Sequence, residues 1–392
     1  MLFFNTFLKI RRENEEYFFF AILVSLLSMF QLIASGEGNL LPEFKTELKE
    51  TDAIKLDWGW QPIVADKYVF LSVHRSGIIN IFKRNINNGD ICFLSAINFV
   101  EDLGKPGKHF DGYMVFSDKK ILYVSGAWTH AQSDIHSIGL SWYKIEYDGK
   151  ATKLGHLDCS AGVLFKSPKN DLLYLVCMFS KNLQEIKLNP ADGTPSISKT
   201  ISGKGLGQGF VISPDQKFCY SMIDDSIAVL SCADNGELSY ISSVDFPEKP
   251  TGKISDYCIF VSPDGKHLYT FLRYVQDKTA KCAGRIFKRD EKNGALSFLK
   301  NADINELTGI KQVIFLTDGK VAYYCGEAFN ICGLGFLTRN PDTGDISFGG
   351  KAKGSNPAFC FDYDPNTGTI YLGGYHSQKV FKIFKAYKAH KE

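Results

Sequence analysis

The chain has 392 residues, of which 44% are hydrophobic and 22% charged, so it is long and apolar enough to bury a sizeable core. Its formal net charge of +2 gives no electrostatic reason to expect nucleic acid or a strongly anionic surface as a partner. The 31 Phe and 18 Tyr are therefore expected to pack strands and sheets rather than to stack on bases.

The first 36 residues differ in character from the rest of the chain. Lys9, Arg11 and Arg12 precede an almost uncharged stretch at residues 17–34, which ends in small residues suitable for signal-peptidase cleavage. We expect residues 1–36 to form a hydrophobic export helix. It is either a signal peptide, which leads to secretion or to the secretory-pathway lumen, or a membrane anchor that holds residues 37–392 outside. In both cases residues 1–36 are the only part of the protein that is expected to contact the membrane.

From residue 65 onward one sequence pattern occurs seven times: a run of β-forming residues, a turn rich in Asp, Lys or Asn, and then a second run of β-forming residues. The turns recur roughly every 50 residues, which is the spacing of propeller blades. A second turn, usually Asn-Gly or Asp-Gly, follows each of the first six by about 25 residues and indicates a hairpin. The seven first turns begin at Ala65, Ser117, Ser167, Ser213, Ser262, Thr317 and Asp364.

Each repeat therefore contains four antiparallel strands, and seven such sheets packed radially bury both faces and leave short edges. The predicted fold is all-β, one seven-bladed propeller over residues 37–392 that exists as a monomer. The seventh repeat is incomplete, because strands are expected at 358–362, 370–372 and 380–384 but no fourth strand follows. The alternating segment 44–48 is expected to supply it and so to seal the ring.

Ten cysteines are compatible with an exported chain, because oxidising compartments allow disulfides. Two pairs flank hairpins and are predicted to be disulfides, Cys325 with Cys332 and Cys219 with Cys232. The alternative is that most of the cysteines are small buried apolar residues. No CxxC pair and no His at zinc-ligand spacing occurs in the sequence, so neither a metal nor a cofactor is expected.

The phrase at residues 260–269, followed by 286–297, resembles the blade of the seven-bladed lactonase-type propellers. That family includes bacterial 6-phosphogluconolactonase and fungal carboxy-cis,cis-muconate cyclase. Residues 211–220 and 336–348 repeat the two phrases less completely. The resemblance covers residues 43–385 and consists of turn and packing motifs, which YVTN-like and WD40 propellers share in part. It implies a lactonase, that is a carboxylic-ester hydrolase, or a lactone-forming cyclase.

The resemblance also directs attention to the start of the innermost strand in each blade. Family members often place a His there, facing the central channel, and here only the second blade has one, His109. This departure keeps a non-catalytic role open. The matching positions in the other blades are Gln61, Ser160, Gln208, Asp256, Gln312 and Asn356.

Both kinds of turn share one face of a four-stranded meander, so we expect the site on the opposite face, among the loops between second and third strands and the connections between blades. Lactone chemistry requires a cation beside the carbonyl oxygen and a His or carboxylate to move a proton. The catalytic candidates are Arg75 and Arg273 for the first task and His109, Asp256 and Glu327 for the second. The ligand-binding candidates are His74, Trp128, His130 and His376, and the same face is expected to carry Asp111, His136, Asp224, Asp225 and Lys281.

Two functions remain open. The first is an exported lactonase or cyclase that acts on a small lactone or sugar acid at the channel mouth. The second is a non-catalytic propeller that binds an extracellular protein or glycan through its loop face, because fold alone does not decide function. Export argues against the best-known substrate of the family, since a phosphorylated sugar lactone is a cytosolic metabolite. The sequence contains no Gly-rich phosphate loop, nucleophile elbow or zinc-protease motif.

Overall fold

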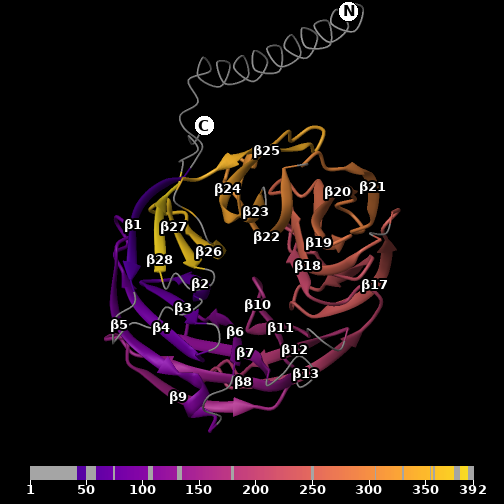
Figure 1. Ribbon diagram of the computed structural model, residues 1–392. Coiled ribbons are helices and arrows are strands. Elements are labelled where there is room, and N and C mark those ends of the chain that lie inside the picture. The colour runs from indigo at the N-terminus through magenta and orange to yellow at the C-terminus, as the bar shows by residue number, and fades with distance from the viewer. Residues whose placement is uncertain are drawn as a thin grey trace, which may run out of the picture. The chain divides into compact units, whose positions relative to one another are not determined.

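The computed structural model describes residues 42–49, 59–73, 76–104, 109–129, 135–177, 181–248, 251–304, 306–328, 331–353, 355, 358–374 and 380–386. These residues form seven four-stranded antiparallel sheets around a common centre (Figure 1). The predicted all-β, seven-bladed propeller is confirmed. Contacts divide the chain into Met1–Leu40 and Leu41–Glu392. The expected export segment, residues 1–36, lies outside the described residues, and among those described no helix is long and apolar enough to cross a bilayer.

The strands are numbered along the chain, and each of the first six blades runs from its innermost to its outermost strand. Blade 1 contains β2(Gly59–Ala65), β3(Tyr68–Val73), β4(Ile78–Arg84) and β5(Ile91–Asn98); blade 2 contains β6(His109–Phe116), β7(Ile121–Thr129), β8(Ile135–Ile145) and β9(Ala151–Leu157). Blade 3 contains β10(Gly162–Lys166), β11(Leu172–Cys177), β12(Asn182–Leu188) and β13(Pro195–Ser202); blade 4 contains β14(Gly209–Ile212), β15(Phe218–Ile223), β16(Ser226–Cys232) and β17(Leu238–Asp245). Blade 5 contains β18(Lys253–Val261), β19(His267–Gln276), β20(Thr279–Arg289) and β21(Leu296–Asn301); blade 6 contains β22(Leu307–Phe315), β23(Val321–Ala328), β24(Ile331–Arg339) and β25(Ile346–Lys351). Blade 7 contains β26(Ala358–Asp364), β27(Thr369–Gly374), β28(Val380–Lys385) and β1(Glu43–Lys49).

Blade 7 is built from both ends of the propeller unit. Its outermost strand, β1, lies antiparallel to β28 along its whole length, and the two strands lie side by side in Figure 1. From β1, the Lys45 ammonium reaches the Asp90 carboxylate of blade 1 at 2.5 Å. How much stability this strand gives the ring stays a prediction, which is taken up in the Discussion.

The second strands of the blades are buried and mostly apolar, whereas the outermost strands are largely exposed. All residues of β3 and β11 are buried, as expected for strands that have a neighbouring blade on each face. In β13 and β9, by contrast, most side chains are exposed. The core therefore lies between the blades, and the rim of the propeller is polar.

One short helix departs from the predicted all-strand pattern. α2(Phe99–Asp102) connects blades 1 and 2. It begins at Asn98, whose side-chain oxygen accepts a hydrogen bond from the Glu101 amide at 3.3 Å. Phe99 is fully buried in the cluster between these two blades. A single capped turn with one buried ring is too short to leave a periodic signal in the sequence.

In six of the seven blades, a tyrosine in the second strand joins the blade to the next one. The tyrosine hydroxyl donates a hydrogen bond to a main-chain carbonyl in the outer hairpin of the following blade, and that carbonyl usually belongs to the turn glycine. The pairs are Tyr68 with Glu146 (2.9 Å), Tyr123 with Gly193 (2.7 Å), Tyr174 with Gly236 (2.6 Å), Tyr220 with Gly294 (3.0 Å), Tyr269 with Gly344 (2.9 Å) and Tyr371 with Gly89 (2.6 Å). We call these bonds the tyrosine latches.

We expect Tyr220→Phe to lower the free energy of unfolding by about 1–2 kcal/mol, because it leaves the buried Gly294 carbonyl without its donor. Urea denaturation at neutral pH measures this change. Tyr147→Phe is the matched control, because the Tyr147 side chain is 70% exposed, and it should change stability by less than about 0.5 kcal/mol. Equal effects of the two substitutions would mean that the latches do not stabilise the ring.

Three buried arginines add a second connection, each binding an aspartate of the preceding blade. Arg289 contacts Asp215 at 2.6 Å and Arg339 contacts Asp264 at 2.8 Å. The third pair, Arg84 with Asp364, links blade 1 to blade 7. In the first two cases the arginine Nε also donates to the latch tyrosine of the preceding blade, at 2.8 and 2.9 Å.

These pairs predict a loss of stability in acid. Burial alone would raise the pKa of Asp264, but hydrogen bonds from Ser262 and Arg339 and the arginine charge outweigh it and hold that pKa below its usual value. A carboxylate with a depressed pKa stabilises the fold above its unfolded pKa and loses this contribution as the pH falls through the folded pKa. We therefore expect stability to fall below about pH 4, and to fall less steeply in Asp264→Asn. Denaturant midpoints measured across this range in both proteins test it; parallel curves would contradict it.

The predicted disulfides are wrong. Cys219 and Cys232 are free thiols, and Cys325 is not disulfide-bonded. The register explains why: Cys219 faces a residue two positions before Cys232, and Cys325 faces one two positions after Cys332. Such diagonal neighbours lie about 7–8 Å apart, beyond the Cα separation of about 4.4–6.8 Å that a disulfide allows. Cys219, Cys232 and Cys325 are buried, which is the alternative that the sequence left open.

Candidate functional site

The central channel contains a cavity of about 590 Å³. The innermost strand of every blade contributes to its wall, β2, β6, β10, β14, β18, β22 and β26. Most of the wall is apolar and includes Val163, Phe165, Phe210 and Ile259. The polar part is formed by Gln61, Tyr113, Gln208, Asp256, Lys311 and Gln312. A mostly apolar cavity with a few convergent polar groups is typical of a small-molecule site.

A shift of register sets the direction of several polar groups. The pairing of the innermost strand with the second strand is irregular at the same place in blades 1, 5, 6 and 7. The residues that resume the pairing after it are Gln61, Asp256, Gln312 and Cys360. All four line the cavity. Such bulges are common beside functional sites, because the extra residue re-aims a side chain.

Asp256 is the centre of the charged cluster in this cavity. One of its carboxylate oxygens is ion-paired with the Lys311 ammonium, and the other is 3.8 Å from Nη1 of Arg273. The side chains are 22% exposed for Asp256 and 17% for Lys311, so water is largely but not wholly excluded. Charges act more strongly there than in bulk water. The cluster therefore holds a carboxylate and a cation within reach of one cavity.

Gln312 and Gln61, which line the same cavity, differ in their hydrogen bonds. Gln312 accepts a hydrogen bond from the Phe361 amide of blade 7 at 3.1 Å, which fixes its side chain across the blade boundary. The carbonyl oxygen of Gln61 has no hydrogen-bond partner within the described part of the chain. A buried acceptor without a partner is costly, so Gln61 is suited to a donor group of a bound molecule.

Two thiols, Cys258 and Cys360, line the cavity, and burial raises the pKa of both. Burial raises the pKa of Cys360 to about 12, and the nearby Lys311 only partly opposes this. The thiolate, which is the reactive form, is therefore scarce. A mechanism in this cavity must use the carboxylate and the ammonium group instead.

Of the five catalytic candidates from the sequence, the structure brings Asp256 and Arg273 together. Their backbones are directly paired between β18 and β19. His109 and Glu327 lie in β6 and β23, but their side chains are outside the described residues, as is Arg75. Among the ligand-binding candidates, His74, His130 and His376 are also outside the described residues, and Trp128 is described only as part of β7.

Two of the other residues predicted on this face, Asp224 and Lys281, have ordinary partners, whereas the side chains of Asp111 and His136 are outside the described residues. Asp224 has a positive φ of 55° in the tight turn after β15, and its carboxylate is 2.7 Å from the Lys181 ammonium. Lys281 donates to the Gln276 side chain at 2.9 Å. Within the described residues no group of three or more His, Cys, Asp or Glu is arranged to hold a metal ion.

Sequence reasoning missed Lys311. It falls where the pairing is irregular, between Ile310 and Gln312. In a regular strand, the side chains of Ile310 and Lys311 would point to opposite faces of the sheet. A bulge changes this alternation, and the sequence alone does not show at which residue a bulge occurs. The signal that was available is the position next to Gln312, which the family resemblance had already placed at the channel.

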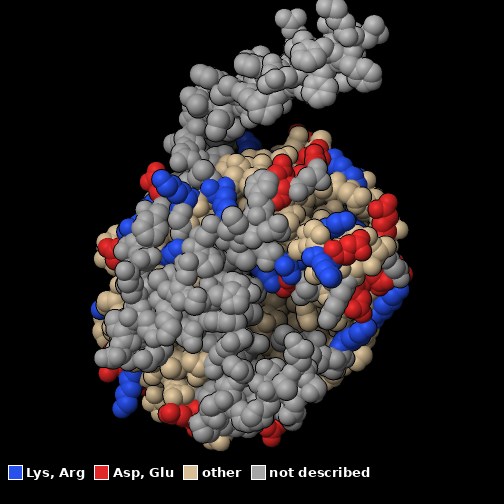
Figure 2. Space-filling model, in the orientation of Figure 1, with Lys and Arg blue, Asp and Glu red and all other residues tan. Residues whose placement is uncertain are grey.

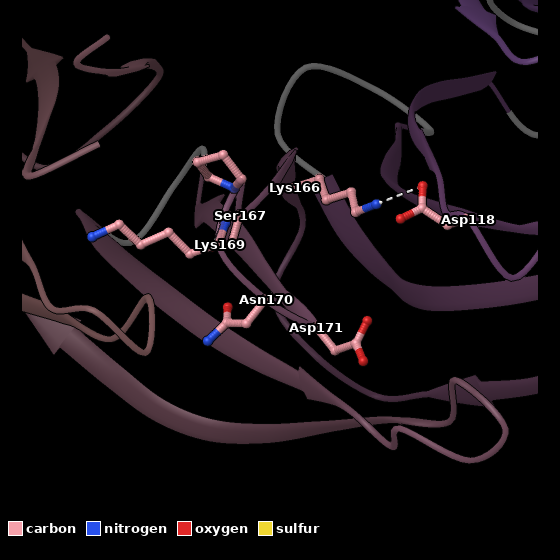
Figure 3. Close-up of a pocket in the computed structure, with 7 residues that line it drawn as sticks. Asp118, Lys166, Ser167, Lys169, Asn170 and Asp171 are labelled. Carbon is pink, nitrogen blue, oxygen red and sulfur yellow. Dashed lines mark hydrogen bonds and ion pairs between the residues drawn. The ribbon is translucent and has the colours of Figure 1, made fainter. Parts of the chain in front are cut away.

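A second cavity, of about 430 Å³, lies among the first turns of blades 2 and 3. Figure 3 shows Lys166 pointing to Asp118, which it meets at 3.1 Å, while Lys169 points the other way. Lys169 donates to the Ala233 carbonyl of blade 4 at 3.1 Å. These charges connect neighbouring blades, so we assign this cavity to the packing of the ring and not to a ligand.

The charge on the visible face is mixed. Figure 2 shows Lys, Arg, Asp and Glu side chains interspersed around the central hollow, without a large area of one sign among the described residues. A strongly anionic macromolecule would need such an area.

Comparison with known proteins gives information on the fold. Neither a protein-family model nor a curated protein matches the chain. Among solved structures, a protein from Lactobacillus plantarum matches 77% of this chain and 86% of its own, with 15% identity and a TM-score of 0.58. A Bacteroides uniformis protein with the provisional description 6-phosphogluconolactonase matches 76% of this chain and 85% of its own, with 14% identity and a TM-score of 0.57.

A functionally different protein matches as well. Hydrazine synthase of Kuenenia stuttgartiensis matches 87% of this chain and 99% of its own, with 14% identity and a TM-score of 0.56. At these identities the likeness shows the fold, which is the one that the sequence resemblance to lactonase-type propellers predicted. Because proteins of different function share it, the choice of function depends on the channel residues.

Proposed function

We propose that this chain is a lactonase-like propeller that hydrolyses a small lactone in its channel cavity. The observation that supports the proposal is the ion pair of Asp256 and Lys311, at the wall of a cavity of about 590 Å³ to which every blade contributes. This pair supplies both groups that lactone hydrolysis needs.

In the proposed reaction a water molecule attacks the lactone carbonyl carbon. Asp256 takes a proton from this water, and the Lys311 ammonium neutralises the charge that develops on the carbonyl oxygen. The bond between the carbonyl carbon and the ring oxygen then breaks, and the ring oxygen receives the proton from Asp256. The product is the open hydroxy acid. Arg273, 3.8 Å from the second oxygen of Asp256, acts as a positioning residue that keeps the carboxylate oriented.

Each charged group has its partner before substrate arrives, so the lactone carbonyl must approach Lys311 while the ion pair loosens. A neutral lactone suits this arrangement, because the cluster contains both signs of charge. We further propose that residues 1–36 direct export and that the protein acts outside the cytoplasm as a monomer. A neutral sugar lactone is compatible with that location, whereas a phosphorylated one is a cytosolic metabolite.

A panel of lactones tests the proposal. The secreted protein is incubated with neutral sugar lactones, simple aliphatic lactones and a phosphorylated sugar lactone, and acid release is followed by pH-stat titration. We expect turnover of at least one neutral lactone. The matched control is the same protein with Asp256→Asn, whose shape is unchanged. Absence of turnover with every compound would overturn the proposal.

The alternative is a non-catalytic propeller that binds a carbohydrate or a protein carrying one. Gln61, Gln208 and Gln312 favour it, because amides at the channel wall are good partners for sugar hydroxyls. Binding of a sugar to the protein without turnover, measured by calorimetry and weakened by Gln61→Ala, would support this reading instead.

A further inference from the structure

Blade 5 carries a third pocket, which shares no lining residue with the channel cavity. Its volume is about 300 Å³, at the lower end of the range for small-molecule sites. It lies between β20, the end of β21 and the connection from blade 4. The lining residues used below are Glu248, Thr251, Tyr274, Arg285 and Asn301.

Arg285 is the unusual group in this pocket. Its side chain is only 3% exposed. Its Nη2 donates to the Glu248 carbonyl, and its Cζ is 4.5 Å from the centre of the Phe246 ring. Nε and Nη1 have no hydrogen-bond partner within the described residues.

The other buried arginines of the described residues show what is missing. Arg84, Arg289 and Arg339 each bind an aspartate carboxylate of the preceding blade. Arg285 has no carboxylate bound to it in the described part of the chain. Burial lowers the pKa of Arg285, and the nearby Glu248 charge only partly opposes this. Arginine nevertheless keeps its proton, so a positive charge without a bound carboxylate among the described residues remains at the pocket.

We propose that this pocket binds a small oxyanion, a carboxylate or phosphate group, that neutralises Arg285. The guanidinium group matches the geometry of such groups. The Tyr274 and Thr251 hydroxyls and the Asn301 amide are the further donors at the wall. This inference does not depend on the proposed lactonase activity, because the two cavities are separate.

Three variants test this proposal: one should abolish anion binding, one should tighten it, and one is a control that should leave it unchanged. Asn301 lies directly opposite Arg285 on β21 and is exposed, so Asn301→Asp places a carboxylate beside the arginine without disturbing the core. This internal carboxylate should abolish anion binding and raise the thermal midpoint. Glu248→Gln removes the acidic charge at the rim and should tighten binding several-fold. Lys288→Gln removes an exposed charge from the same strand, outside the pocket, and should leave binding within about twofold.

The probes are inorganic phosphate, gluconate and, as a comparison, chloride, titrated into the full protein by isothermal calorimetry. We expect one of the two oxyanions to bind, and the preferred one identifies the ligand as a phosphate or a carboxylate. Arg285→Met should weaken that binding by about tenfold or more; if this variant does not fold, Asn301→Asp gives the answer. The proposal is overturned if neither oxyanion binds, if chloride binds equally well, or if Asn301→Asp binds as the parent does.

Discussion

Removal of residues 40–50 should destabilise the whole propeller and not only its last blade. The deletion takes away β1 and leaves the hydrogen-bonding edge of β28 open, next to Phe381 and Ile383, which are fully buried in the intact protein. We expect the free energy of unfolding to fall on the order of 5 kcal/mol, a large part of the stability of a typical domain. The thermal midpoint should fall by about 10 °C or more.

Differential scanning calorimetry of the deletion and the parent measures this effect. Lys45→Ala is the control within the same strand, because it removes the partly exposed ion pair with Asp90 but keeps the strand itself. Such pairs contribute up to about 1 kcal/mol. If the deletion melts at the temperature of the parent, β1 does not seal the ring.

Replacement of Lys311 should have the second large effect, on turnover rather than on stability. Lys311→Met removes the charge that stabilises the carbonyl oxygen in the proposed reaction, and loss of one such group lowers the rate by about 10²–10³. Asp256 keeps Arg273 nearby, so the carboxylate is not left as an isolated buried charge. Lys311→Arg should restore part of the rate, because it restores the charge with a different shape.

The measurement is kcat and kcat/KM for the best lactone of the panel. Lys320→Met is the matched control, since Lys320 is an exposed lysine in the first turn of the same blade, and it should be as active as the parent. A Lys311→Met protein that folds and keeps full activity would exclude this lysine from the reaction.

The fold could be predicted from the sequence because each turn is marked by characteristic residues that are close together in the chain. Gly265 and Gly294, with φ of 74°, occupy left-handed positions that a hairpin requires. Ser262 and Asp264 hydrogen-bond each other at 2.6 Å inside the first turn of blade 5. Such signals repeat from blade to blade, so their spacing was enough to count the sheets.

The site was less predictable, because it depends on register. Asp256 was found through its position at the start of the innermost strand. Its partner Lys311 lies where the pairing of β22 with β23 shifts register, and the local sequence gives no sign of that shift. The same limit explains the wrong disulfides, since Cys219 and Cys232 share a hairpin but not a directly opposed position. Arg285 was missed for another reason: its missing partner is a property of the packed blades and not of the sequence around it.

The role of Asp256 in the channel cavity is tested by comparing the parent protein with Asp256→Asn on the same lactone in the same pH-stat experiment. We expect measurable hydrolysis by the parent and a rate lower by about 10²-fold or more in the variant, with both proteins folded at the assay temperature. Equal rates for the two folded proteins would contradict the assignment of the channel cavity as the reactive site.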